Sequence, residues 1–282
     1  MHLNYLKLFI NNKAARLGMA LLGTVLLAAL LGPHLVPHDP WQYSGHVLQA
    51  PCERHWLGTN DVGQDIFSQL VYGARTSMAV AFGVALLSTL TALVLGSATA
   101  MVGGRCDTVF MRITDAMLSI PPVLIIILAA AYLRPGIPSL ILLLVAVGWP
   151  AGARIVRAQV LTLKERTHVY AAYTFGSGPL AVFIKHLLPD LGPVAAAGFI
   201  QGARRAVLTE AGLSFLGITS PGLISWGSII YQAVNFSYLG VWKWWLLPAC
   251  AALSVTVLAI TYLAYGMEAV LDRPLGVQGR EV

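Results

Sequence analysis

The stretch TSMAVAFGVALLSTLTALVLGSATAMVGG, from Thr76 to Gly104, runs for 29 residues without a Lys, Arg, Asp or Glu. A helix needs about 20 apolar residues to cross the hydrocarbon core of a membrane, so this stretch is ample for one span. The whole chain has the same character, since 57% of its 282 residues are hydrophobic and 11% are charged. Ordinary soluble domains carry about 25% charged residues. We therefore predict an all-α protein surrounded by lipid.

This composition excludes a secreted disulfide scaffold, a disordered tail and a nucleic-acid-binding protein that depends on clustered phosphate contacts. The three cysteines, Cys52, Cys106 and Cys250, are too scattered to indicate a disulfide framework or a metal cage. We therefore expect no nucleic-acid partner, and no metal or other cofactor bound by this chain.

Five further apolar stretches complete a prediction of six membrane spans. The Pro121-Pro122 pair predicts a kink or break in the third span. The first span, 17–36 within a longer uncharged stretch, follows three basic residues and is predicted to be an uncleaved anchor helix. The five stretches are Leu17–His38, Ala116–Leu133, Pro135–Ala153, Leu191–Phe215 and Trp244–Met267.

The span at Leu191–Phe215 must hold Arg204, Arg205 and Glu210. A charged residue at a helix centre costs about 2.5 to 3.5 kcal/mol on insertion scales, so these side chains need partners or a function. One hypothesis is that at least one of the two arginines lines a translocation path and attracts an anion such as a peptide carboxylate, with Glu210 as a further candidate for the path. The alternatives are that the arginines pair with Glu210, with helix-end carbonyls or with a partner permease, or that the helix begins after Arg205.

The basic residues predict that both termini face the cytoplasm. With the N-terminus inside, twelve of the 18 Lys and Arg fall on cytoplasmic segments and four on outside segments. The predicted order is a cytoplasmic N-terminus (1–16), the anchor helix (17–36), an outside loop (37–75), a five-helix core (76–267) and a cytoplasmic tail (268–282). The core includes a cytoplasmic loop (154–190) and an outside segment (218–243).

Three smaller groups of polar residues have a structural and a functional interpretation. His34 and His38 could hold one metal ion, although Pro37 between them favours two solvated histidines. Asp61 and Asp65 could form a metal or acid pair, although a capped amphipathic segment on the outer face is favoured. We expect Asp107, Arg112 and Asp115 to form a local ion-pair cluster. All seven histidines lie outside the middles of the spans, which disfavours a path for bare nickel.

The cytoplasmic loop has its own pattern, KERTHVYAAYTFGSGP from Lys164 to Pro179, followed by HLLP from His186 to Pro189. It predicts a short helix through Tyr173, a turn at Gly176 to Gly178 and a second helix that opens with Pro179. From periodicity alone this helix-turn-helix is either a plain surface connection or a functional element.

The spacing of Ala171-Ala172, Gly176 and Leu188-Pro189 resembles the "EAA" coupling motif of permease subunits in bacterial ABC importers. Further blocks resemble the second permease of dipeptide, oligopeptide and nickel importers, and the likeness covers nearly the whole chain in order. These blocks are His55–Ser68 with Tyr72–Arg75, Gly103–Asp107 with Met111–Asp115, Glu210–Gly217 with Trp226-Gly227, and the terminal Leu271-Asp272-Arg273.

The resemblance implies a type I (MetI-like) importer permease in the bacterial inner membrane, with cytoplasmic coupling helices. It implies that a homologous permease, two ATPase subunits and a periplasmic or lipid-anchored binding protein are partners. The chain has no Walker-A loop, so ATP and Mg would be bound by the ATPases. The implied substrate is a di- or oligopeptide; nickel or a metal chelate is the alternative, and a self-contained secondary transporter is the alternative of another class. The implied coupling residues are Tyr170, Ala171, Ala172, Gly176, Leu188 and Pro189.

The sequence departs from this family at four charged positions. The family usually has Arg at the positions of Gln64 and Gln69, Asp at that of Asn60, and Glu at that of Tyr170. Any role that depends on those charges is therefore not expected here.

Overall fold

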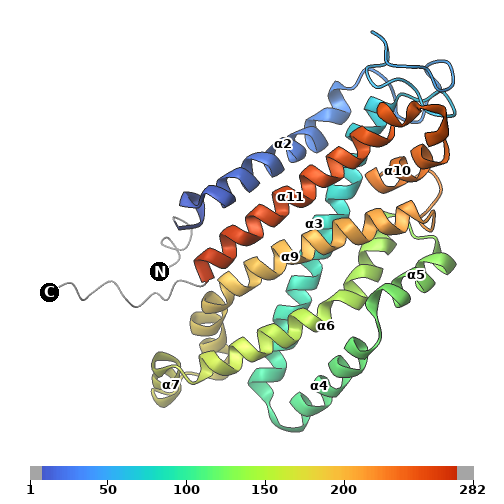
Figure 1. The fold of residues 1–282 in the computed structure, drawn as a ribbon. Coiled ribbons are helices and arrows are strands. Elements are labelled where there is room, and N and C mark those ends of the chain that lie inside the picture. The colour runs from blue at the N-terminus through green and yellow to red at the C-terminus, as the bar shows by residue number, and fades with distance from the viewer. Residues whose placement is uncertain (1–7, 272–282) are drawn as a thin grey trace.

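The computed structural model describes residues 8–271, and in this range all regular elements are helices (Figure 1). Five are long and apolar enough to cross a membrane, and a bent pair, α4 with α5, makes a sixth candidate. The all-α prediction is confirmed for this part of the chain. The five are α2 (Lys13–Leu35), α3 (Ile66–Val102), α6 (Ile137–Lys164), α9 (Leu188–Phe215) and α11 (Leu246–Leu271).

The third predicted span is broken rather than kinked. α4 (Gly104–Ser119) and α5 (Pro122–Leu133) meet at an angle of 75°. Ile120 between them is extended, as expected for a residue before proline, and Pro122 opens the new helix. The twelve residues of α5 are about 18 Å long, too short to cross the roughly 30 Å hydrocarbon core alone.

The long helices run side by side, so that the chain has two distinct ends (Figure 1). At one end lie the start of α2, the end of α11, α4 and the short helix α7 (Thr167–Thr174); we name this the α7 end. At the other lie the loop 36–65 and α10 (Trp226–Asn235). The loops predicted to face the cytoplasm and the outside therefore lie at opposite ends. The predictions for residues 1–7 and 272–282 lie outside the described residues.

The centre of the bundle is the crossing of α3 and α6, where small residues bring two backbones together. A Cβ atom added at Gly96 would lie 2.5 Å from the carbonyl oxygen of Ala153. One added at Gly152 would lie 3.0 Å from the Cβ of Ala92. Small residues spaced four apart are the usual means of close helix packing in lipid, where no hydrophobic effect drives helices together.

Arginines of α6 hold α4 against it at the α7 end. Arg157 pairs with Asp107 through both carboxylate oxygens, and Arg154 pairs with Asp115. The predicted cluster of Asp107, Arg112 and Asp115 is therefore wrong in its partners. The reason is tertiary, because α6 packs against α4 and supplies the arginines with which both aspartates pair.

A series of hydrogen bonds holds the loop 36–65 together, and it ends at Asp65, the N-cap residue of α3. The Asp65 carboxylate accepts hydrogen bonds from the backbone and hydroxyl of Ser68. His55 Nδ1 lies 2.9 Å from the other oxygen of Asp65. Because of this cap, α3 begins at Ile66, ten residues before the charge-free stretch. Asp61 lies in the preceding turn, where burial raises the pKa of its carboxyl. The two aspartates therefore do not share a helix face. Asp65 caps a helix, in agreement with the favoured interpretation of a capped segment.

Asn60, Gln64 and Gln69, the uncharged residues at which this part of the sequence departs from the resembled family, lie together where the loop meets α3. The Asn60 and Gln69 side-chain amides both donate to Gln64 Oε1, at 2.9 and 2.7 Å. The Gln64 and Gln69 amides also donate to the carbonyl oxygens of Trp41 and Pro40. A neutral amide network therefore joins the three positions.

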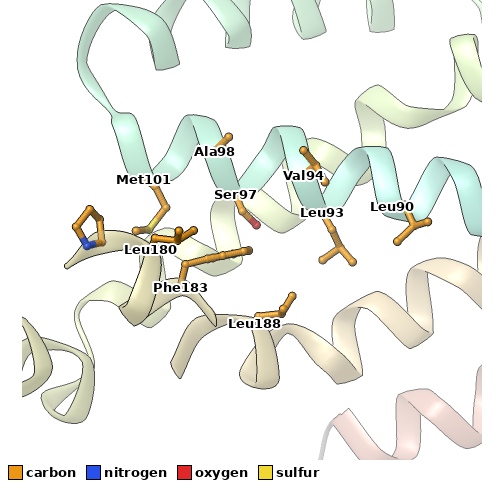
Figure 2. A pocket seen from close by; sticks show the side chains of 10 residues that line it. Leu90, Leu93, Val94, Ser97, Ala98, Met101, Leu180, Phe183 and Leu188 are labelled. Carbon is orange, nitrogen blue, oxygen red and sulfur yellow. The ribbon is translucent and has the colours of Figure 1, made fainter. Parts of the chain in front are cut away.

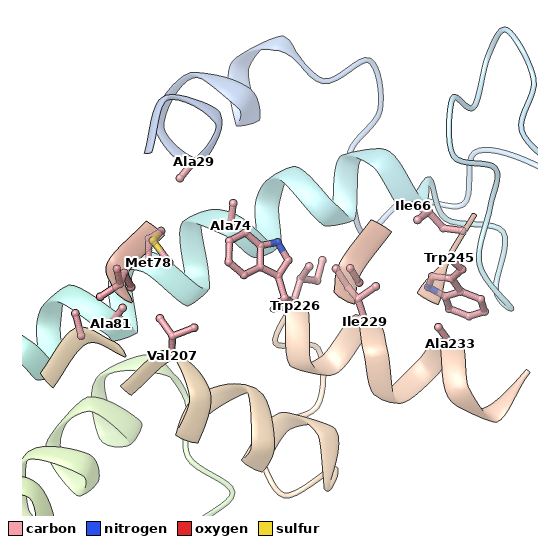
Figure 3. Close-up of a cluster of buried hydrophobic side chains, with 14 of the residues drawn as sticks. Ala29, Ile66, Ala74, Met78, Ala81, Val207, Trp226, Ile229, Ala233 and Trp245 are labelled. Carbon is pink, nitrogen blue, oxygen red and sulfur yellow. The ribbon is translucent and has the colours of Figure 1, made fainter. Parts of the chain in front are cut away.

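The predicted outside segment 218–243 is more structured than a loop. Its helix α10 packs against α3, α9 and α11, and Trp226 and Ile229 are buried in the largest hydrophobic cluster (Figure 3). The Trp226 indole donates to the carbonyl oxygen of Leu70 on α3. Trp245, at the start of α11, is also buried in this cluster, so it is a core residue.

We predict that Gly96→Ala destabilises the protein by about 1 to 3 kcal/mol, because the new methyl group meets backbone atoms that cannot move aside. Gly212→Ala in α9 is the control, since a Cβ there has nothing within 4 Å. Thermal unfolding in detergent should show a lower midpoint for Gly96→Ala alone. Equal midpoints for both variants would contradict the close crossing.

Candidate functional site: the helical loop between α6 and α9

The loop that joins α6 to α9 consists of α7, the one-turn helix α8 (Pro179–Val182) and the π-helical turn η1 (Phe183–Leu187). Its base is apolar and buried. Val169 of α7 is fully buried in a cluster that joins the loop to α3, α6 and α9. This cluster fixes α7 on the ends of the long helices. Its other fully or nearly buried members at this end are Leu163, Val182, Leu187 and Leu191.

The turn after α7 is a Schellman motif. The Ser177 N–H donates to the Ala172 carbonyl oxygen, and the Gly176 N–H donates to that of Tyr173. Gly176 has a φ of +85°, which favours glycine, and Gly178 precedes Pro179 as the N-cap of α8. The predicted helix, turn and second helix are therefore confirmed. The carbonyl of Ala172 is itself part of the turn.

The tip of the loop presents apolar side chains to the surroundings. Phe175 is 88% exposed, Tyr170 71% and Leu180 70%, whereas Ala171 and Ala172 are half-buried. We name Tyr170, Phe175 and Leu180 the exposed knob. Large apolar side chains exposed on a loop between spans are typical of an interaction site.

The motif residues Leu188 and Pro189 lie at the base of the loop, where the helix changes its winding. The Leu188 N–H donates to the carbonyl oxygen of Phe183, five residues back. Pro189 has no N–H for the carbonyl of Lys185, so the normal ladder is interrupted there. π-helical turns are rare and are frequent at functional sites.

A polar contact joins α7 to the first turn of α9. Asp190 Oδ2 lies 3.5 Å from Arg166 Nη1 and 3.6 Å from His168 Nε2. The ring of His186 lies beside that of His168, with centroids 6.1 Å apart. Arg166 is the N-cap residue of α7, so this contact adds an electrostatic tie to the apolar base.

The predicted path residues on α9 lie on different sides of the helix. Glu210 is fully buried, and its two oxygens accept hydrogen bonds from Ser214 at 2.8 Å and from Ser77 of α3 at 3.1 Å. Arg205 is exposed and Arg204 is half-buried. In the described part of the chain neither arginine lies within 4.0 Å of an acidic group.

Two alternatives for these residues are therefore corrected. Hydroxyl groups from α3 and α9 satisfy Glu210 in place of the arginines. One helix carries all three residues, so the alternative that the helix begins after Arg205 is also wrong.

A second cluster at the opposite end has the residue types of a metal site. Ligand atoms of His38, His55 and Asp65 lie within 4.8 Å of one another. His55 uses both ring nitrogens, toward Asp65 and toward the Ser44 carbonyl, and His38 Nε2 lies 2.9 Å from the Arg54 carbonyl oxygen. All these contacts join residues of the loop 36–65, so the cluster holds this loop together. His34 is exposed at the end of α2, so the structure does not bring it together with His38 as a metal pair.

Sequence reasoning missed Phe175, Leu180, Val169 and Asp190. Aromatic residues in an otherwise polar loop were the available signal for the exposed knob. Nothing in the local pattern distinguished Val169 as the buried anchor or Asp190 as the partner of α7, because both depend on packing against the long helices.

Comparison with known proteins identifies the family. Residues 89–276 match the family of binding-protein-dependent transport system inner membrane components. Residues 5–51 match the N-terminal transmembrane domain of oligopeptide transport permease C. The chain belongs to this permease family. The resemblance carried by the sequence blocks is therefore confirmed, and the permease is a multi-pass protein of the inner membrane.

Individual relatives cover almost the whole permease. A dipeptide transport system permease protein of Bacillus subtilis is 33% identical over 267 residues, which is 94% of this chain and 83% of that protein. A protein of Brucella suis biovar 1 named as a peptide transport system permease is 37% identical over 272 residues, 95% and 90% of the two chains. Another from the same organism, named as a peptide permease, is 33% identical over 94% and 88%.

We predict that Gly176→Ala weakens the turn by about 1 kcal/mol, because a Cβ atom is unfavourable in the left-handed region. Gly178→Ala is the matched control, since both positions have open space for a Cβ and only Gly176 has a positive φ. Hydrogen exchange of the α7 amides should accelerate severalfold in Gly176→Ala alone. Identical exchange in both variants would contradict this role of the turn.

Proposed function

We propose that this permease forms half of the translocation path of an ATP-driven peptide importer, and that the loop between α6 and α9 docks on an ATPase subunit. The observation that carries the proposal is the exposed knob on a buried base. Tyr170, Phe175 and Leu180 are presented to the surroundings, while Val169 and Leu187 beneath them are fully buried. An apolar surface of this kind in water fits a cleft on another protein.

ATP binding belongs to the partner in this proposal. The chain lacks the Gly-x-x-x-x-Gly-Lys loop that cradles phosphates, so ATP and Mg would be bound by two ATPase subunits. A homologous permease would supply the other half of the path, and a periplasmic or lipid-anchored binding protein would deliver the substrate. The permease itself would catalyse no reaction.

The structure offers a direct mechanical route from the knob into the membrane. α7 is joined to α9 by the buried cluster around Val169 and by the contact of Arg166 and His168 with Asp190. α9 then crosses to the opposite end, where Ser225, the N-cap residue of α10, lies beside the buried Glu210. A displacement of α7 would therefore move α9 as a rigid body, one of the known modes of conformational switching.

We propose six spans with both termini in the cytoplasm. The support is the charge bias of the sequence together with the arrangement of the helices, in which the start of α2, the end of α11 and α7 share one end of the bundle (Figure 1). The sixth span requires that α4 and α5 cross as one bent unit. The exposed knob would then face the cytoplasm, where an ATPase is available.

A peptide is the best supported substrate class, because the relatives described above are named for peptide or dipeptide transport. Arg205 is the side chain best placed to meet a peptide carboxylate or the partner permease, since it lies on the exposed side of α9. Nickel or a metal chelate has no such support. A secondary transporter would need intramembrane carboxylates for ion coupling, and Glu210 is enclosed by hydroxyl groups.

We predict that Arg205→Gln lowers peptide uptake by tenfold or more while the amount of assembled complex stays unchanged, because the charge acts on substrate. Arg204→Gln, one residue away and half-buried, should have a smaller effect on uptake. Uptake by vesicles and the yield of purified complex provide the two readouts. An equal loss of complex and uptake in Arg205→Gln would instead assign the residue to assembly.

We predict that Phe175→Asp and Tyr170→Asp each reduce co-purification of the ATPase at least tenfold, because a carboxylate in an apolar cleft is not solvated. Tyr238→Asp is the matched control, since Tyr238 is equally exposed at the opposite end of the bundle. Affinity purification of the tagged permease from membranes gives the measurement. Normal ATPase recovery with both knob variants would refute the docking surface, and transport by the permease alone in vesicles would refute the ABC mechanism.

A further inference from the structure

The first turn of α10 lies tightly between two long helices, at the end of the bundle opposite α7 (Figure 3). A Cβ atom added at Gly227 of α10 would lie 2.5 Å from the carbonyl oxygen of Ala211 on α9. One added at Gly73 of α3 would lie 3.3 Å from the backbone nitrogen of Trp226. The start of α10 therefore lies close to the backbones of both α3 and α9.

The carboxyl group of Glu210 lies at the point where these three helices meet. Its side chain is fully buried, which is costly unless hydrogen bonds satisfy both oxygens. One oxygen accepts a hydrogen bond of 3.1 Å from Ser77 Oγ of α3, and the other accepts one of 2.8 Å from Ser214 Oγ of α9. Ser225, the N-cap residue of α10, hydrogen-bonds to the same carboxyl group. The group therefore has a serine partner at each of the three helices.

Two of these serines connect the carboxyl group to the first backbone N–H groups of α10, which have no partner within the helix. The N–H of Trp226 donates to Ser77 Oγ at 3.5 Å, and the N–H of Ser228 donates to Ser225 Oγ at 3.3 Å. Each hydroxyl group accepts from α10 and has its own proton left for the carboxyl group. Glu210 therefore caps α10 indirectly, and a carboxylate near a helix N-terminus is also favoured by the helix dipole.

The carboxyl group adds direction to a contact that packing already supports. Trp226 and Ile229 of α10 are buried in the largest hydrophobic cluster, so apolar burial holds α10 in the bundle without Glu210. Apolar contacts are non-directional, whereas hydrogen bonds weaken steeply when their angle changes. The serine contacts of Glu210 therefore set the angle at which α10 begins relative to α3 and α9.

We propose that Glu210 is a positioning residue for transport, which fixes the start of α10 to α9 so that the outer segment 218–243 moves when α9 moves. The inference rests on the proposed function, in which the loop between α6 and α9 passes a displacement to α9. From Leu188 to Glu210 this helix rises about 33 Å, so it reaches from the loop to the start of α10 as one element. Without the serine contacts, α9 could move while α10 stayed in place.

The first test measures how firmly the start of α10 is held, by hydrogen exchange of the permease complex in nanodiscs. Ser77→Ala removes the hydroxyl group between Glu210 and the N–H of Trp226, so exchange of the first α10 amides should become about fivefold faster. Ser97→Ala is the matched control, because Ser97 is also buried on α3 but lies toward the α7 end, and its Oγ has no hydrogen-bond partner among residues 8–271 (Figure 2). Equal exchange of these amides in the two variants would overturn the serine network.

The second test measures whether α10 follows α9 when the ATPase binds nucleotide. In the native complex, a non-hydrolysable ATP analogue with Mg should change hydrogen exchange both in α7 and in the first turn of α10. Glu210→Gln has nearly the same size but one acceptor oxygen in place of two. In this variant the change in α10 should fall about fivefold, the factor for one lost hydrogen bond, while the change in α7 stays the same. Glu268→Gln, the same substitution at an exposed carboxyl group of α11, should leave both changes as in the native complex.

The outcomes separate this inference from the proposed function. If α7 responds to nucleotide and α10 of Glu210→Gln responds as strongly as in the native complex, the role of Glu210 is overturned and the proposed docking loop is unaffected. If α7 of the native complex does not respond, the coupling function is refuted, and the role of Glu210 with it. Where Glu210→Gln does not assemble, Ser77→Ala replaces it in the second test, because it keeps the carboxyl group, adds no bulk and should show the same loss at α10.

Discussion

The structure depends on the close approach of α3 and α6 at Gly96 and Ala153. In lipid the two helices gain nothing from burying apolar surface, so they stay together only through packing at short range. Gly96 has no side chain, and the backbone of α6 comes into contact with α3 there. The same two helices continue to the α7 end, where Val160 and Leu163 support Val169 of the loop. The exposed knob therefore stands on a rigid frame.

Polar groups of the bundle find hydrogen-bonding or ionic partners on neighbouring helices, and each such contact joins two separate elements. Glu210 on α9 is held by a hydroxyl of α3, and Trp226 of α10 donates to a carbonyl of α3. At the α7 end, Asp190 joins α9 to α7, while Arg157 joins α6 to α4. Each of these contacts joins two different helices. A permease that changes shape during transport would have to move these groups together or exchange their partners.

Part of this fold follows from local sequence pattern. The break at Pro121-Pro122 and the turn around Gly176 could be predicted, because proline and glycine restrict the backbone wherever they occur. Other features could not. The partners of Asp107 and Asp115 lie on another helix, and the contact of His55 with Asp65 depends on how the loop 36–65 folds back on itself. The arginines of α9 were expected to have Glu210 as one possible partner, but serine hydroxyls occupy that place.

The sequence by itself determined that this is an all-helical membrane protein, where its loops lie along the chain, and which permease family it resembles. Hydropathy, charge bias and motif spacing are properties of the chain order, so they need no coordinates. Only the tertiary structure decided that Phe175 is exposed while Val169 is buried, that Ser97 Oγ is buried with no hydrogen-bond partner among residues 8–271, and that Glu210 is enclosed. The reason is that burial and hydrogen bonding are set by neighbours from distant segments, which meet when the helices pack.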